Sequence, residues 1–214
     1  MVRPIFETFT PSTASLTNYA SNVTGASWTI TTHTTTDGLA HQVTIRNDSG
    51  TDHSGKTVTL VGLDQDGAAQ TNTFALPGAS ATVTSTLYFS YLTSATPSAT
   101  IGADTMDIGS ADTFSSRTIP ATWRGSQAIL STVPSGTINT TIQYTNDNIQ
   151  GQPNTPAHSR PYNWQTDAGV PTTNATSAGS TPVWVIPMAW RLIANSYSAG
   201  ATVELTISQM NSQS

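Results

Sequence analysis

The sequence predicts an all-β protein with two antiparallel β-sandwich or jelly-roll-like units and an extended N-terminal arm. Charged residues make up only 9% of the 214 residues, whereas helix surfaces depend on Lys, Glu and Arg. Thr and Ser supply about 30% of the chain, and Thr suits the solvent side of a strand because it is β-branched and polar. Many short runs alternate apolar and polar residues, and none has convincing helical spacing.

Composition divides the chain into three parts. Residues 1–24 are predicted to form the arm, because they contain two prolines and are dominated by Thr, Ser and Asn. Residues 25–116 and 117–214 are predicted to form the two β units. Within the second unit, residues 146–180 are rich in Pro, Asn, Thr and Gly and show no periodicity, so we expect a long loop.

Alternation marks the strands of the first unit. The clearest signal is a hairpin in which residues 56–63 and 68–76 flank the turn Asp64-Gln65-Asp66-Gly67. Val58, Leu60 and Gly62 are expected on one face of its first strand. Further strands are expected at 26–33, 41–46, 80–86, 100–103 and 105–109, and the aromatic cluster at 87–92 is expected to enter the core.

The second unit is predicted to contain strands at 127–133, 137–144, 183–193 and 201–209. In the last of these, Val203, Leu205 and Ile207 alternate with polar residues and should face the core. Trp28, Trp184 and Trp190 fall on predicted alternating strands, where burial is the expected state of a tryptophan.

Charge and composition exclude several classes of function. The net charge is −5, and the seven Lys and Arg residues are scattered, so nucleic acid is not an expected partner. A membrane is not expected either, because no apolar run approaches the length of a span. The chain has no cysteine, which excludes disulfides and thiolate metal sites. Its beginning has no apolar stretch of secretory length, so we expect synthesis in a cytoplasm without export.

No catalytic or metal-binding pattern stands out, and we expect neither an enzyme nor a bound cofactor. The four histidines, at 33, 41, 53 and 158, lack the spacing of a helical metal site. Asp64 to Gly67 resembles the start of a calcium loop, but the glutamate that would complete it is missing. Glu7 and Glu204 are the only glutamates, and no carboxylate pair is evident.

Two blocks resemble virion structural proteins of tailed bacteriophages. Residues 41–109 are similar to a pattern of strand, polar loop, hairpin, polar strand and aromatic residue, here Val61 to Gly67 for the hairpin and the region of Phe89 for the aromatic. The stretch from Pro187 to Gln209 is similar to an ending in which an A-x-R-L strand and a V-x-L-x-I-x-Q strand flank a turn. The run Ile142 to Asp147 resembles the strand that usually precedes that ending.

The resemblance implies a particle component assembled in the host cytoplasm and located in the virion. It implies a capsid decoration or cement protein, a head-fibre base, or a neck or tail accessory, without choosing among them. The leading hypothesis is a decoration or cement protein that binds the major capsid protein or other virion proteins as a homo-oligomer, with a trimer favoured, because weak contacts repeated over many copies give high avidity. Two alternatives stay open. One is a neck, tail or head-fibre accessory protein of the virion, and the other is a carbohydrate-binding or adhesive module.

Candidate contact residues follow from their chemistry and position. Aromatic and arginine side chains are enriched where proteins bind partners, and those in irregular segments or in the arm are the better candidates for exposure. The candidates are Trp123, Arg124, Arg160, Trp164, Phe6 and Phe9.

Overall fold

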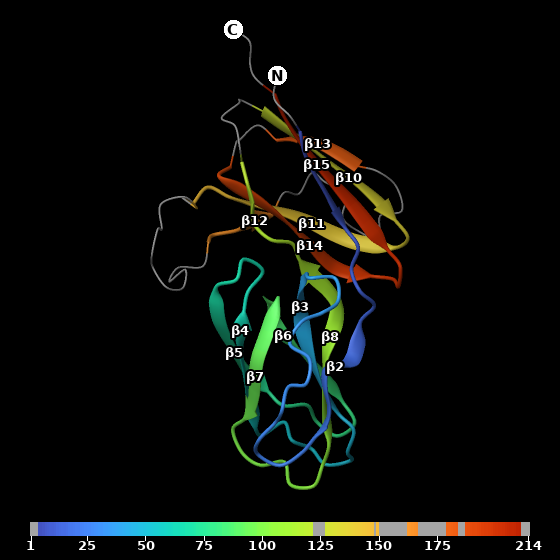
Figure 1. Cartoon of the computed structure of the whole chain (residues 1–214), viewed down its shortest axis with the longest axis vertical. Helices are drawn as coiled ribbons and strands as arrows, with labels where there is room; N and C mark the ends of the chain where they lie inside the picture. Colours follow the sequence, from blue (N-terminus) through green and yellow to red (C-terminus); the bar gives the residue numbers. More distant parts are fainter. Residues whose placement is uncertain are drawn as a thin grey trace. The chain divides into compact units, whose positions relative to one another are not determined.

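The structure is a computed structural model, and it describes residues 4–121, 127–147, 149, 162–166, 179–183 and 187–210. The regular elements in this described part are all β-strands (Figure 1), which confirms the predicted fold class. The chain forms two compact units. The N-terminal unit is Ser12–Phe114, and the C-terminal unit combines Met1–Pro11 with Ser115–Ser214.

The N-terminal unit contains two sheets. One runs β8-β3-β6, with β2 paired to β8, and the other runs β5-β4-β7. The bounds are β2 (Ser15–Val23), β3 (Ala40–Asn47), β4 (Thr57–Leu63), β5 (Ala69–Ala75), β6 (Thr82–Phe89), β7 (Tyr91–Pro97) and β8 (Met106–Ser115). The predicted hairpin is confirmed as β4 and β5, which pair antiparallel from Thr57↔Ala75 to Leu63↔Ala69.

The two sheets of the N-terminal unit share one apolar core, so the unit is a β-sandwich. Side chains from both sheets belong to the same buried cluster, including Ile45 of β3, Leu60 of β4 and Ile108 of β8. Val58 and Leu60 are fully buried, as the alternation predicts, while Val61 on the other face of β4 is exposed. Each fully buried aliphatic or aromatic side chain of this kind contributes roughly 1.5–3 kcal/mol.

Side chains join the free edges of the two sheets along β5 and β6. The amide of Asn72 on β5 accepts a hydrogen bond from the backbone N–H of Thr86 on β6, at 3.1 Å, and donates one to its hydroxyl, at 3.2 Å. Two residues away, the Gln70 amide donates to the carbonyl of Tyr88. Unpaired edge groups otherwise invite another strand, so these amides close this side of the sandwich.

The opposite side is closed by the segment between β2 and β3. The N–H groups of Thr31 and Thr32 donate to the Tyr19 carbonyl of β2, and the Leu92 N–H of β7 donates to the His33 carbonyl. The predicted strand at 26–33 is therefore wrong: the segment is irregular, and the strand lies upstream as β2. Trp28 is nevertheless buried as predicted. The predicted strand at 100–103 is also wrong, because these residues form a turn before β8.

The C-terminal unit contains a sheet ordered β1-β15-β10-β13, called sheet A below, and a second set ordered β12-β11-β14 with β9 paired to β14. The bounds are β1 (Ile5–Phe9), β9 (Ile119–Pro120), β10 (Gln127–Ser135), β11 (Ile138–Thr145), β12 (Gln165–Thr166), β13 (Gly179–Val183), β14 (Ala189–Tyr197) and β15 (Thr202–Met210). Val203, Leu205 and Ile207 of β15 are fully buried, as predicted.

Three sequence-based boundaries differ from the structure. The predicted strand at 183–193 is two strands, since β13 ends at Val183 and β14 begins at Ala189. The described residues of the predicted loop at 146–180 include β12 and the start of β13. Residues 1–24 contain β1 and β2, which pair with β15 and β8. The predicted arm is thus extended, but its strands are divided between the two units because their apolar residues complete two different sheets.

Two glycines are required by close approach of neighbouring backbone. A Cβ atom on Gly62 of β4 would lie 2.1 Å from the Tyr91 carbonyl oxygen and 2.9 Å from the Phe89 ring. A Cβ atom on Gly109 of β8 would lie 2.1 Å from the Ser15 carbonyl oxygen. Because backbone atoms cannot move aside as a flexible side chain can, any larger residue must displace a strand.

We predict that Gly62→Ala lowers the free energy of unfolding by about 2–3 kcal/mol, because the added methyl group overlaps the β7 backbone. Gly55→Ala is the matched control, since its Cβ would meet nothing within 4 Å and should change stability by less than about 0.5 kcal/mol. Urea unfolding of both variants measures the difference. Equal stability of the two would contradict the close approach.

Candidate functional site

The outward face of sheet A exposes apolar side chains. Phe6 of β1 is 58% exposed and Val133 of β10 is 45% exposed, the two highest values among the described large hydrophobic residues. The strands bring them to one face: Phe6 pairs with Thr206 of β15, and Val133 pairs with Glu204. Exposed aromatic and aliphatic groups gathered on one sheet face are typical of a contact surface.

The two candidate phenylalanines of β1 have different environments. Phe6 lies on the outward face just described, whereas Phe9 is only 6% exposed and pairs with the buried Val203. Sequence reasoning did not select Val133, although a signal was present. Val133 ends the predicted strand 127–133, in which a period of two turns every second side chain to the outer face.

Trp164 lies in a second cluster of the C-terminal unit. The Arg191 guanidinium carbon is 4.4 Å from the centroid of the Trp164 ring, and the Arg191 Nε–H donates to the Gln143 side-chain oxygen at 2.7 Å. The Tyr162 ring meets Trp164 edge-on, with centroids 6.2 Å apart. Trp164 is partly buried. An arginine beside two aromatic rings has the composition of a binding hot spot.

The remaining sequence candidates are Trp123, Arg124 and Arg160. All three lie outside the described residues.

The outward face of sheet β5-β4-β7 carries no charged side chain. The three strands, Thr57–Leu63, Ala69–Ala75 and Tyr91–Pro97, contain no Asp, Glu, Lys, Arg or His. Thr59 of β4 pairs with Thr73 and Thr96 on its two neighbours, and its hydroxyl is 3.0 Å from that of Thr73. We call this surface the neutral face. The exposed Val61 lies near its middle.

Asp37 is the centre of a buried polar cluster in the N-terminal unit. Its carboxylate accepts hydrogen bonds from His41 Nε2 at 2.9 Å, from the Thr35 hydroxyl at 2.7 Å and from the Ser12 N–H at 2.6 Å. Burial alone would raise the pKa of Asp37, but these hydrogen bonds outweigh it and hold that pKa well below its ordinary value. Burial, with the nearby Asp37 charge, raises the pKa of Tyr19.

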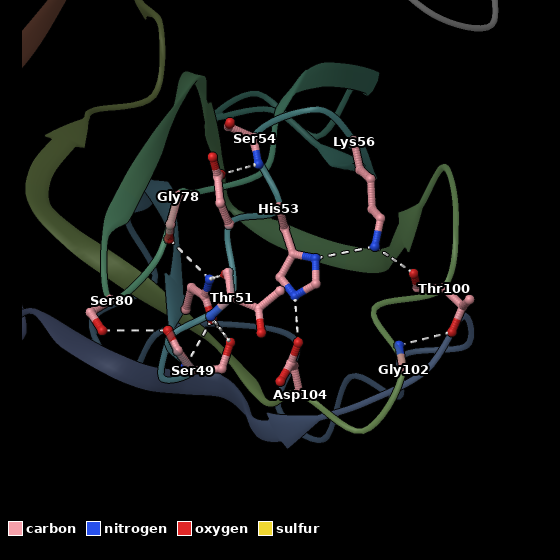
Figure 2. A network of polar contacts seen from close by, with 12 residues as sticks. Ser49, Thr51, His53, Ser54, Lys56, Gly78, Ser80, Thr100, Gly102 and Asp104 are labelled. Atoms are coloured by element: carbon pink, nitrogen blue, oxygen red, sulfur yellow. Dashed lines mark hydrogen bonds and ion pairs between the residues drawn. The ribbon is translucent and has the colours of Figure 1, made fainter.

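A second histidine, His53, joins two loops of the same unit (Figure 2). Its Nε2 is 2.9 Å from the Asp104 carboxylate, and its Nδ1 is 3.1 Å from the Lys56 ammonium. Because an ammonium only donates and a carboxylate only accepts, Nδ1 accepts from Lys56 and the Nε2–H group donates to Asp104. Lys56 also donates to the Thr100 carbonyl at 2.7 Å. The Lys56 ammonium is held by two acceptors, so it links the two loops and is not arranged as an activated nucleophile.

The described histidines, His33, His41 and His53, do not gather into one site. His33 donates from Nδ1 to the Leu92 carbonyl at 2.7 Å and stacks on Tyr91, with ring centroids 4.9 Å apart. Within the described ranges, no group of three or more His, Asp or Glu side chains could hold a metal ion. Asp64 serves the hairpin turn, since its Oδ1 accepts the N–H groups of Asp66 and Ala68.

The part of the chain that the structure describes contains no helix long and apolar enough to cross a membrane. No model of a protein family matches the chain. A search of curated proteins finds no match to its sequence.

Acid should weaken the N-terminal unit through Asp37. The pKa of Asp37 is lower in the folded chain than in the unfolded one. Ionised Asp37 therefore stabilises the fold above the ordinary aspartate pKa of about 4. This stabilisation is lost as the pH falls through the lower pKa of the folded state. We expect Asp37→Asn to lower the free energy of unfolding by about 2 kcal/mol or more at neutral pH. Below pH 5, the free energy of unfolding of this variant should fall less steeply than that of the unmodified protein.

Urea unfolding between pH 7 and pH 2 measures this effect. Asp112→Asn removes the same charge from an exposed position and is the control. If Asp37→Asn had the stability and the pH profile of that control, the cluster would not have the role assigned to it.

Proposed function

We propose that this chain is a structural protein of a tailed-bacteriophage particle, of the capsid decoration or cement type, and that it acts by binding other proteins rather than by catalysis. The resemblance of two sequence blocks to virion proteins supports the particle assignment. In the structure, those blocks comprise β3 to β8 of the N-terminal unit and β14 with β15 of the C-terminal unit.

The neutral face is the observation that carries the proposal. Both sides of its sandwich are closed, by the Asn72 and Gln70 amides and by the segment containing His33. Strand addition at these edges is therefore blocked, and contacts with a partner must use the faces. A sheet face of threonine methyl and hydroxyl groups can be buried without desolvating a charge.

Such a face fits a protein that is present in many copies on a shell. A single small interface without a charged or deeply inserted group is weak. Copies linked as an oligomer multiply weak contacts into high avidity, because each further contact becomes intramolecular. This is the physical reason for favouring a homo-oligomer, with the major capsid protein or another virion protein as partner.

Copy number distinguishes decoration from a neck, tail or head-fibre role. Quantitative mass spectrometry of purified particles should give hundreds of copies for a decoration protein and about a dozen or fewer for tail machinery, following the repeated geometry of a shell. A monodisperse monomer that is missing from particles and does not bind them would contradict the whole proposal.

A charge placed on the neutral face should weaken particle binding. We expect Thr71→Glu, opposite Val61, to lower the apparent affinity for particles at least about tenfold, because every bound copy must bury an unpaired carboxylate. Thr17→Glu adds the same charge to an exposed position on β2 and should bind as the unmodified protein does. Co-sedimentation with stripped particles provides the measurement. Equal binding of the two variants would exclude this face.

The cluster of Trp164, Arg191 and Tyr162 favours a second candidate function, a carbohydrate-binding module. An aromatic ring beside guanidinium and amide donors could stack on a sugar and bond its hydroxyls. On a glycan array, this function predicts saturable binding that Trp164→Ala abolishes, while Val61→Ala leaves it unchanged. If no glycan binds the unmodified protein, this second candidate is discarded.

A further inference from the structure

Glu204 is an ionisable side chain without a partner in the described structure. It lies in the middle of β15, on the outward face of sheet A, and is partly buried. Neither a hydrogen bond nor an ion pair joins it to another described residue. The other glutamate differs: Glu7 of β1 points to the opposite face, where Arg117 donates to it at 2.6 Å.

The neighbours of Glu204 on this face are hydroxyl side chains and two exposed apolar ones, Phe6 and Val133. Thr8 of β1 and Val133 of β10 lie directly opposite it, one on each side. Phe6 is its diagonal neighbour, because Phe6 pairs with Thr206, and diagonal side chains in such a ladder are roughly 7 to 8 Å apart. The alternation of β1, β15 and β10 places Phe6, Thr8, Ile129, Ser131, Val133, Ser135, Thr202, Glu204, Thr206 and Ser208 on this face.

Of these ten positions Glu204 is the only charged one, so the face carries one negative charge flanked by exposed apolar groups. A ligand that matches it needs one cation with apolar material around it. A metal ion does not fit, because a single carboxylate with hydroxyl neighbours is a poor ligand set. A planar guanidinium fits better than an ammonium, since it can pair with both carboxylate oxygens and lay its face on an aromatic ring.

We infer that the outward face of sheet A binds an arginine side chain presented by a partner protein. The guanidinium pairs with Glu204 and stacks on Phe6, and apolar residues beside the arginine pack against Val133. Cation–π contact at such exposed sites contributes little binding energy, so the recognition is specific but weak. This inference extends the proposed contact function to the C-terminal unit and specifies the chemistry of the partner.

The arginine is not expected from the described part of a second copy of this chain. The cations that the structure describes are engaged: Arg46 with Asp48 and Asp107, Lys56 with His53, Arg117 with Glu7, and Arg191 with Gln143 and Trp164. Moving one of them to Glu204 of another copy would break an existing contact for each one formed. A different protein that supplies an arginine has no such cost.

The probe is a blocked peptide, acetyl-Val-Arg-Val-amide, titrated into the isotope-labelled full chain and followed by amide NMR shifts. The matched peptide with citrulline in place of arginine keeps the shape and loses the charge. We expect saturable shifts centred on β1, β10 and β15 at millimolar peptide with arginine, and shifts at least about threefold weaker with citrulline.

Two variants separate the site from a general charge effect. Glu204→Gln should weaken arginine-peptide binding about threefold or more, whereas Glu7→Gln removes the same charge from the adjacent strand and should not. Phe6→Leu keeps an apolar group but removes the ring, and should weaken binding by a smaller factor. The unbound spectra of all three show whether each variant is folded.

Any of three results would overturn the inference: no saturable shifts in the unmodified chain, equal binding of the two peptides, or equal loss in Glu204→Gln and Glu7→Gln. Each leaves the particle proposal standing, because that proposal is tested by copy number and by the neutral face of the other unit. Conversely, a chain missing from particles that still binds arginine through Glu204 would retain this site without the virion role.

Discussion

The need to satisfy the backbone groups at every sheet edge shapes the N-terminal unit. A sandwich of two open sheets leaves edges that attract further strands, and here side chains and one irregular segment occupy them. Asn72 and Gln70 bond the β6 backbone across one side, while the Leu92 amide bonds the His33 carbonyl on the other. Once the edges are closed, the sheet faces remain available to another protein, and the proposed function follows from that restriction.

The placement of the charged residues also leaves the sheet faces with little charge. The chain has few charged residues, and several of those described lie in buried or partly buried pairs that hold loops: Asp37 with His41, and Asp104 with His53. In each pair the two side chains satisfy one another within the unit. The neutral face thereby stays free of charge, and the outward face of sheet A keeps a single one, on Glu204. Each unit thus offers a surface of different chemistry.

Local pattern predicted much of this fold. The turn at Asp64 to Gly67 predicted the hairpin, and the alternation on β15 predicted the buried face of the last strand. Both are local patterns, because residues that alternate in polarity along a strand alternate between core and solvent. The strand expected at 26–33 failed because Trp28 enters the core from an irregular segment, which alternation cannot distinguish from a strand. The surfaces were harder to predict. Glu204 on a polar strand face resembles any solvated glutamate until the register shows Phe6 and Val133 beside it, and that register joins residues almost 200 positions apart.

A cryo-electron reconstruction of particles that contain this chain tests the central claim most directly, namely that its sheet faces are contact surfaces for other proteins. The account predicts ordered density for repeated copies, with the threonines of β4, β5 and β7 against a neighbouring protein. Density that leaves this sheet in solvent while contacts run through the Asn72 edge or the loops would contradict it.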